Sequence, residues 1–194
     1  MFFCDFLETG VVYHIAPIND FKKILERGIG YKDKVSYKSK YIEFHNFLDS
    51  FRTSDIPDWV ERQKAIFASM NFKKHPCFHA HSVILAVKVY PERCWIANEN
   101  RGNQLYEPFI LKDIKEFRSA NHYLNTKGAA MALQYWKTSL SFQDNIKKRM
   151  DLVRGYDAEV MIFHPIPPED IKPLFIVSDH RILTIDQWRR IFCI

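Results

Sequence analysis

The segment 82–90, SVILAVKVY, carries the clearest strand pattern in the chain, a run of apolar and β-branched residues. Further strands are predicted by shorter apolar runs, at 10–14, 94–97, 158–164 and 173–178. Helical segments lie among these runs, but without the regular strand–helix–strand alternation that marks a parallel sheet. We therefore predict an α+β fold with a mostly antiparallel, twisted β-sheet core, in a single domain over residues 1–194.

The composition supports a folded chain. Hydrophobic residues make up 47% of the sequence and aromatic residues 15%, which is enough for a dense core and argues against disorder. The 28 basic and 23 acidic residues give a formal net charge of +5. This mild excess suits an anionic partner such as nucleic acid or a dinucleotide, without requiring one.

Cysteine usage and hydropathy indicate a cytoplasmic protein. The cysteines are scattered and form no CxxC pair: Cys4, Cys77, Cys94 and Cys193. This favours reduced thiols over a disulfide framework. The first residues, MFFCDFLET, lack the basic region of a secretory signal, and apolar runs such as 83–87 are far too short to span a bilayer.

The stretch 10–31, GVVYHIAPINDFKKILERGIGY, places His14 at the end of a predicted strand. A short amphipathic helix follows at once and runs to Arg27, and Gly28 is expected to end it in a left-handed conformation. A strand-end histidine can present its ring to a cleft and take part in acid–base chemistry near neutral pH. On this motif alone, a locally satisfied, partly buried histidine is the favoured interpretation.

Two adjacent segments are assigned to a loop and a helix. Residues 31–53 are polar, aromatic and lysine-rich without a clear period, which predicts a long functional loop. Residues 54–72 begin with capping residues and Pro57 and then show an apolar stripe, which predicts a helix. In such a helix Arg62 would lie one turn from Asp58, so a surface ion pair is its ordinary role. Further helices are predicted in two pieces over 128–153 and at 184–192.

The stretch 157–171 contains the strongest candidate acid. Glu159 begins an apolar strand and therefore lies at a sheet end, followed by a turn that three prolines stiffen. A carboxylate in that position can hold sugar hydroxyls or stabilise positive charge that develops on a sugar. A solvated acid at the end of a strand is the alternative.

Two other patterns could bind ligands. His75, Cys77, His79 and His81 alternate and are zinc-ligand types, but Pro76 disturbs a strand there and a histidine-rich loop is the favoured interpretation. Over 31–41, lysines alternate with tyrosines, so bases could stack on the rings while lysines contact phosphates. A solvated charged face explains this run equally well. The phosphate-loop, GxSxG and HExxH motifs are absent from the sequence.

Taken together, the stretches 10–31 and 157–171 resemble DarT-type ADP-ribosyltransferases and the wider diphtheria-toxin-like class. In that family a strand that ends in histidine is followed by a helix and a glycine. A later strand begins with the catalytic glutamate and runs into a proline-rich turn. The resemblance implies an ADP-ribosyltransferase-like split β-sheet, with NAD bound in a cleft as the substrate.

The resemblance also implies roles for individual residues. His14 would bind an NAD ribose with Tyr13 nearby, and Glu159 would hold the nicotinamide ribose and steady the oxocarbenium-like centre. Aromatic rings such as Tyr31 and Tyr37 could stack on nicotinamide. The family uses an arginine in its NAD-binding loop, for which the candidates here are Arg52 and Arg62.

By the same resemblance the acceptor would be a base of single-stranded DNA, and the protein a toxin held by an antitoxin. Another macromolecular acceptor, such as a protein, stays open. Two alternatives stay open from the residues themselves. The first is a nucleic-acid-binding module without catalysis, based on the 31–41 run. The second is a zinc-dependent hydrolase or nuclease based on the histidines and cysteine of 75–81.

Overall fold

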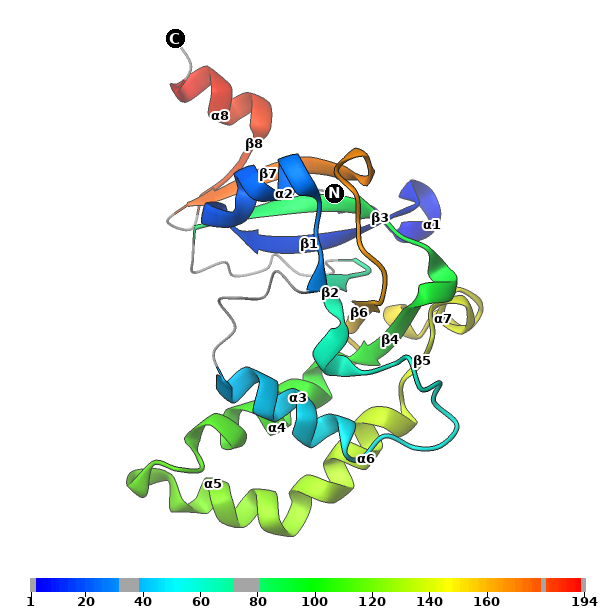
Figure 1. The fold of residues 1–194 in the computed structure, drawn as a ribbon, viewed down its shortest axis with the longest axis vertical. Helices are drawn as coiled ribbons and strands as arrows, with labels where there is room; N and C mark the ends of the chain where they lie inside the picture. The colour runs from blue at the N-terminus through cyan, green and yellow to red at the C-terminus, as the bar shows by residue number, and fades with distance from the viewer. Residues whose placement is uncertain (1–2, 32–38, 72–80, 179–180, 193–194) are drawn as a thin grey trace.

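The computed structural model describes residues 3–31, 39–71, 81–178 and 181–192. It contains one antiparallel sheet of eight strands in the order β5-β4-β6-β2-β1-β3-β7-β8 (Figure 1). The strands are β1 Val11–Pro17, β2 Ile66–Ser69, β3 Ser82–Lys88, β4 Cys94–Asn98, β5 Leu140–Ser141, β6 Ala158–Ile162, β7 Ile171–Ser178 and β8 Arg181–Thr184. The α+β class, the antiparallel sheet and the five predicted strands are confirmed. The prediction that the first strand ends at His14 is wrong, because β1 continues to pair with β3 as far as Pro17 and His14 lies in its middle.

The sheet consists of two halves that meet at β1 and β2. β1 pairs with β3 along its whole length, whereas its register with β2 is a single pair, Tyr13 opposite Ser69. One hydrophobic cluster draws buried residues from both halves, including Val12, Leu85, Ile96, Val160 and Ile162. The two halves therefore share a core although their strands are joined over one residue pair.

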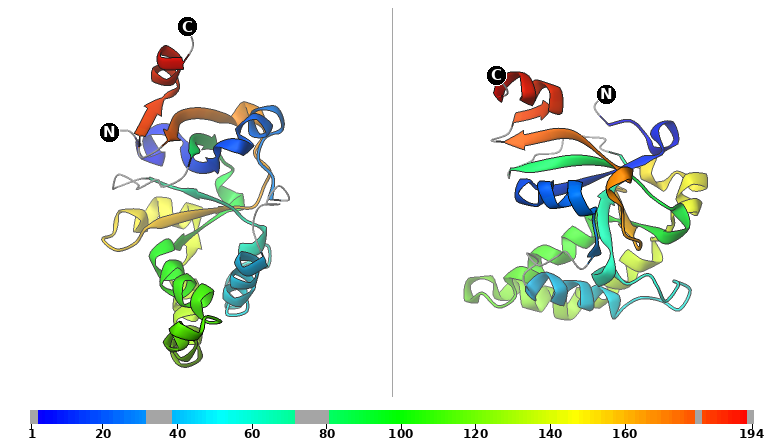
Figure 2. Two further views of the ribbon diagram at one scale, coloured as in Figure 1. Left: turned by 90° about the vertical axis from the view of Figure 1, so that its left-hand side faces the viewer. Right: turned by 45° about the horizontal axis from the view of Figure 1, so that its top comes forward.

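Helices cover the half that contains β2, β4 and β6. Figures 1 and 2 show α3 Ser39–Asp49, α4 Glu99–Leu111, α5 Arg118–Tyr123 and α6 Ala129–Lys137 gathered at the end of the molecule away from β7 and β8. A second hydrophobic cluster joins these helices to the sheet through Phe44, Leu105, Trp136 and Met161. Along β6, Met161 belongs to this cluster and Val160 to the first, so Glu159 shares the helix-facing side with Met161.

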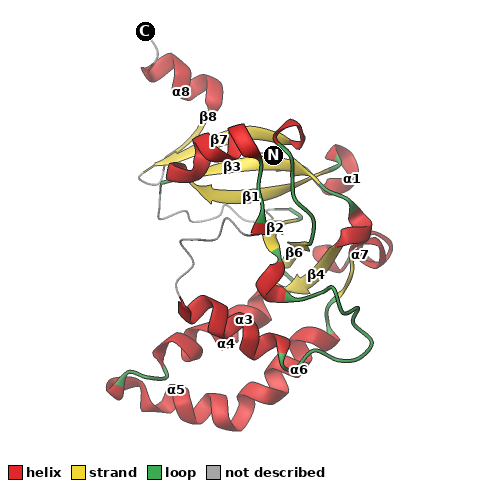
Figure 3. Ribbon diagram, viewed as in Figure 1, coloured by secondary structure: helices red, strands yellow, loops and turns green. Residues whose placement is uncertain are grey.

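The remaining helices are short and lie elsewhere, as Figure 3 shows: α1 Phe6–Thr9, α2 Phe21–Arg27, α7 Phe142–Lys148 and α8 Ile185–Phe192. The predicted helix before Gly28, the two-piece helical region and the closing helix are thus confirmed. Within the described residues, every helix is too short or too polar to cross a lipid bilayer.

Two predicted elements are wrong. Residues 39–49 of the predicted loop form α3, because Phe44 and Leu48 recur at helical spacing and bury one face of the segment. The predicted helix over 54–72 is replaced by turns, a 3₁₀ turn η3 at Arg62–Lys64, and β2. Local propensity favoured the helix there, but pairing of β2 with β6 buries Ile66 and Ala68 against the core.

The two stretches that carry the family resemblance contact each other. Gly28 ends α2 with a φ of 79°. The next residue, Ile29, forms an isolated antiparallel bridge with Ile166 through hydrogen bonds of 2.8 and 3.0 Å. A Cβ atom on Gly28 would lie 2.1 Å from the Ile166 carbonyl oxygen. Glycine is therefore required by both the backbone angle and the close approach of the proline-rich turn.

Replacing Gly28 should loosen this contact. We expect Gly28→Ala to lower the free energy of unfolding by more than about 2 kcal/mol, because the positive φ of 79° and the clash with Ile166 act together. The matched control is Gly155→Ala, where φ is also positive, at 82°, but no atom lies within 4 Å of the new Cβ. Urea denaturation of both variants measures the difference, and equal losses would contradict the close contact.

Candidate active site

A pocket of about 530 Å³ opens where the two halves of the sheet meet. Its wall comes from β1, α2, α3, η3, β2, α4 and β6. The volume lies within the range of sites that enclose a small molecule or a cofactor. His14, Arg62 and Glu159, which the sequence indicated, all line it.

His14 is fixed at the place where β1 and β2 separate. Its Nδ1 lies 2.7 Å from the carbonyl oxygen of Phe67 on β2. Because a carbonyl oxygen accepts and cannot donate, Nδ1 carries the proton in this contact. The imidazole thus replaces a strand-to-strand backbone bond and orients the histidine ring at the pocket wall.

Glu159 lies on β6, opposite Ser69 of β2, which in turn lies opposite Tyr13 of β1. Two strand spacings place its backbone roughly 10 Å from that of Tyr13, the neighbour of His14. Its side chain is only 7% exposed. The early histidine and the late glutamate therefore contribute to the same pocket from different halves of the sheet.

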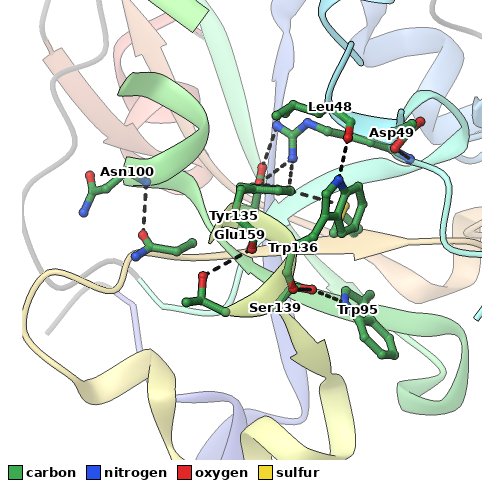
Figure 4. A network of polar contacts seen from close by, with 12 residues as sticks. Leu48, Asp49, Trp95, Asn100, Tyr135, Trp136, Ser139 and Glu159 are labelled. Carbon is green, nitrogen blue, oxygen red and sulfur yellow. Dashed lines mark hydrogen bonds and ion pairs between the residues drawn. The ribbon is translucent and has the colours of Figure 1, made fainter. Parts of the chain in front are cut away.

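The Glu159 carboxyl group accepts three hydrogen bonds. Arg62 donates from both terminal nitrogens, Nη1 to Oε1 at 2.5 Å and Nη2 to Oε2 at 3.1 Å. Tyr135 donates its hydroxyl to Oε1 at 2.7 Å. Figure 4 shows Tyr135 and Glu159 directed toward each other from α6 and β6. A bidentate arginine and a hydroxyl donor are partners suited to an ionised carboxylate.

Arg62 is itself positioned by its surroundings. The side chain of Asp49, at the end of α3, accepts hydrogen bonds from the backbone N–H groups of Arg62 at 3.0 Å and Gln63 at 3.3 Å. The guanidinium lies 4.7 Å from the ring centre of Phe67 and 5.1 Å from that of Tyr135. Its Nε is buried and has no hydrogen-bond partner among the described residues.

The contacts among Arg62, Tyr135 and Glu159 shift the pKa values of the two donors. Burial acts to lower the pKa of Arg62, but the carboxylate of Glu159 and the Tyr135 hydroxyl together raise that pKa above its ordinary value. Burial raises the pKa of Tyr135 well above its ordinary value; the charge of Arg62 opposes this shift, and Glu159 adds to it. Arg62 therefore stays charged and Tyr135 stays protonated at neutral pH, so both remain donors to Glu159.

Indole hydrogen bonds hold α6 against its neighbours and so fix Tyr135. Trp136 donates from Nε1 to the Leu48 carbonyl oxygen at 2.6 Å, which ties α6 to α3. Trp95 on β4 donates from Nε1 to Ser139 Oγ at 2.8 Å, just beyond the end of α6. These contacts, drawn in Figure 4, tie the helix that carries Tyr135 to α3 and to β4.

The other predicted site residues lie in varied positions. Tyr13 contributes to the pocket wall, but its hydroxyl donates to the Cys4 carbonyl oxygen at 2.6 Å. Arg52 lies outside the pocket wall and donates to the carbonyl oxygens of Asp58 and Val60, at 3.1 and 2.7 Å. Of the two candidate arginines, the structure therefore brings Arg62, and not Arg52, to Glu159.

Most of the residues that were predicted to stack on nicotinamide or to bind a metal lie outside the described residues or outside the pocket wall. Tyr31 is 46% exposed and lies outside the pocket wall, and Tyr37 falls outside the described residues. His75, Cys77 and His79 also fall outside them, while His81 is exposed. In the described part of the chain, no group of three or more histidine, cysteine or acidic side chains could hold a metal ion.

Several pocket residues were missed in the sequence. Tyr41 on α3 and Asn103 and Glu99 on α4 line the pocket, and Tyr135 lies behind Glu159. Glu99 had a detectable signal, since it directly follows a buried strand and begins a helix after a capping asparagine. Tyr135 had none, because a tyrosine within an apolar helix is usually an ordinary core residue.

The buried ion pair generates a stability prediction. Glu159→Leu should lower the free energy of unfolding by about 3–5 kcal/mol, because Arg62 would be left buried without a counter-charge. The double variant Arg62→Met, Glu159→Leu should recover most of that loss. Removing the exposed pair Lys22–Glu26 by Glu26→Gln, as the control, should cost less than about 0.5 kcal/mol. Chemical denaturation of the wild type, Arg62→Met, Glu159→Leu and the double variant measures the coupling, which additive losses would contradict.

Comparison with known proteins does not indicate a function for this pocket. No family model, curated protein or solved structure shows a significant match to the chain.

Proposed function

We propose that the protein is an ADP-ribosyltransferase that takes ADP-ribose from NAD and transfers it to a nucleic acid base. The observation that carries this proposal is the convergence of His14, Arg62 and Glu159 on one pocket at the junction of an antiparallel sheet. The resemblance in the sequence rests on two stretches far apart in the chain. Their contact through Ile29 and Ile166, and their shared pocket, support interpreting them as one site.

The chemistry follows from the arrangement of the charges. In this proposal His14 hydrogen-bonds a ribose of NAD, while its Nδ1 stays anchored to the Phe67 carbonyl oxygen. The bond between the nicotinamide nitrogen and the ribose anomeric carbon breaks, and nicotinamide leaves with the electron pair. Positive charge then develops on the ribose. A carboxylate that faces this centre lowers the barrier because it is already oriented and desolvated.

Arg62 and Tyr135 contribute to this step through Glu159. They fix the carboxylate geometry before the substrate arrives, so little reorganisation accompanies the charge development. Arg62 and Lys23 also leave the pocket less negative than its three acids, Asp20, Glu99 and Glu159, would alone make it, which favours entry of an anionic dinucleotide.

The proposed acceptor is a base of single-stranded DNA. The net charge of +5 supports an anionic acceptor, and Tyr41 offers a ring at the pocket wall on which a base can stack. An enzyme that modifies DNA bases would be harmful in its own cell. We therefore include a neutralising antitoxin protein as part of the proposal.

Nicotinamide release from NAD tests the proposal. Purified protein incubated with NAD and a mixed pool of single-stranded oligonucleotides should release nicotinamide and transfer labelled ADP-ribose to the DNA. Glu159→Gln should lower the rate by about 10²-fold or more, because the variant lacks the charge that stabilises the ribose cation. His14→Gln should instead weaken NAD binding, measured by calorimetry.

The control for both variants is Glu107→Gln, an exposed position on α4 outside the pocket wall. It should leave binding and rate unchanged. Circular dichroism establishes that each variant is folded at the assay temperature. Wild-type protein that neither binds nor cleaves NAD would overturn the proposed function.

A further inference from the structure

A second carboxylate, Glu99, lines the same pocket as Glu159. Glu99 is the first residue of α4, and Asn98 caps the helix by accepting from the Asn100 N–H at 3.1 Å. The two acids differ in their surroundings. Glu159 is buried and engaged by Arg62 and Tyr135, whereas the side chain of Glu99 is exposed at the pocket.

The backbone holds Glu99 beside the start of β6. On the sheet, Ala97 lies opposite Glu159 and Asn98 opposite Ala158. The next residue, Glu99, donates its backbone N–H to the carbonyl oxygen of Asp157 at 2.8 Å. Glu99 is therefore held one residue beyond the end of β4, diagonal to Glu159, by a backbone hydrogen bond to the residue that precedes β6.

The groups around Glu99 favour a proton acceptor. Desolvation, and next the carboxylate of Glu159, raise the pKa of Glu99 above its ordinary value. Asp157 acts in the same direction, whereas Arg62 and a hydrogen bond with Asn103 oppose the shift. The other titratable side chains that line the pocket are Tyr13, His14, Asp20, Lys23 and Tyr41.

We propose, building on the transferase function above, that Glu99 is the general base that takes the proton from the acceptor. The two carboxylates then have separate roles in one pocket. Glu159, saturated by donors from Arg62 and Tyr135, supplies fixed charge and is poorly placed to accept a proton. Glu99 reaches solvent, so it can accept a proton from the incoming nucleophile and return it to water.

The step is balanced without a further reagent. The acceptor nitrogen or oxygen forms a bond to the ribose anomeric carbon, and the bond from that carbon to nicotinamide breaks. Nicotinamide leaves as a neutral molecule with the electron pair. The proton of the acceptor N–H or O–H passes to the Glu99 carboxylate. This assignment specifies the acceptor class as a nucleophile that carries a removable proton, such as a base N–H.

Glu99→Gln tests the role with NAD and the same oligonucleotide pool. The rate of nicotinamide release should fall by about 10²-fold, the usual contribution of a general base, while the Kd for NAD changes less than twofold. In wild-type protein the rate should fall as pH drops through the pKa of Glu99, at a higher pH than for an ordinary glutamate. This limb should vanish in Glu99→Gln and persist in the Glu107→Gln control.

Stability gives an independent readout. Because the folded state raises the pKa of Glu99, its contribution to stability is complete at low pH and is lost as pH rises through the folded pKa. Glu99→Gln, which cannot ionise, should therefore melt at or above the wild-type temperature near pH 7 while losing activity. A purely structural role for Glu99 predicts a lower melting temperature.

The outcomes separate this inference from the proposed function. If the wild-type protein leaves NAD intact, both the general-base role and the transferase function are contradicted. Active wild-type protein with an equally active Glu99→Gln variant overturns the general base and leaves the transferase standing. Loss of NAD binding in Glu99→Gln also overturns it, because Glu99 would then hold the substrate and not the proton. Persistence of the acidic limb in that variant overturns it as well.

Discussion

The contact between Arg62 and Glu159 is the interaction on which the pocket depends. Moving two charges out of water costs several kcal/mol for each, and only good geometry with additional hydrogen bonds recovers that cost. Here the geometry is bidentate and Tyr135 adds a third donor. Because an apolar replacement of both partners should recover most of the stability that a single replacement loses, the pair adds little net stability to the fold. Its physical advantage is therefore a charge fixed in place at the pocket wall, which an apolar core could not supply.

The division of the sheet is the second constraint, and it explains why a pocket exists at all. Strands that pair along their whole length leave no space between them, but β1 and β2 share one pair. Backbone groups exposed by such a separation need other partners. The His14 ring satisfies the Phe67 carbonyl oxygen in this way. The same side chain thus closes the sheet structurally and presents an imidazole to the pocket.

Sequence patterns predicted the strands well, because their buried apolar runs report directly on the core. They failed at α3 and β2. There the local sequence pattern was ambiguous, and contacts with residues far away in the sequence decide the structure. Arg62 illustrates the limit: helical spacing suggested Asp58 as its partner, yet it pairs with Glu159, 97 positions along the chain. Asp58 pairs instead with Arg52, at 3.7 Å. A partner brought close by sheet register leaves no local signal in either segment.

The candidate site shows the same division between local and distant information. His14 and Glu159 could be singled out because each is a polar residue beside the predicted end of an apolar run, although β1 continues past His14 to Pro17. Tyr135 and Glu99 become partners of the site only when α6 and α4 pack on β6 and β4. Since β6 pairs with both β2 and β4, Glu159 is brought between Arg62 on one side and Glu99 on the other. One strand therefore places a fixed carboxylate beside an exposed one, and the separate roles proposed for the two glutamates rest on this asymmetry.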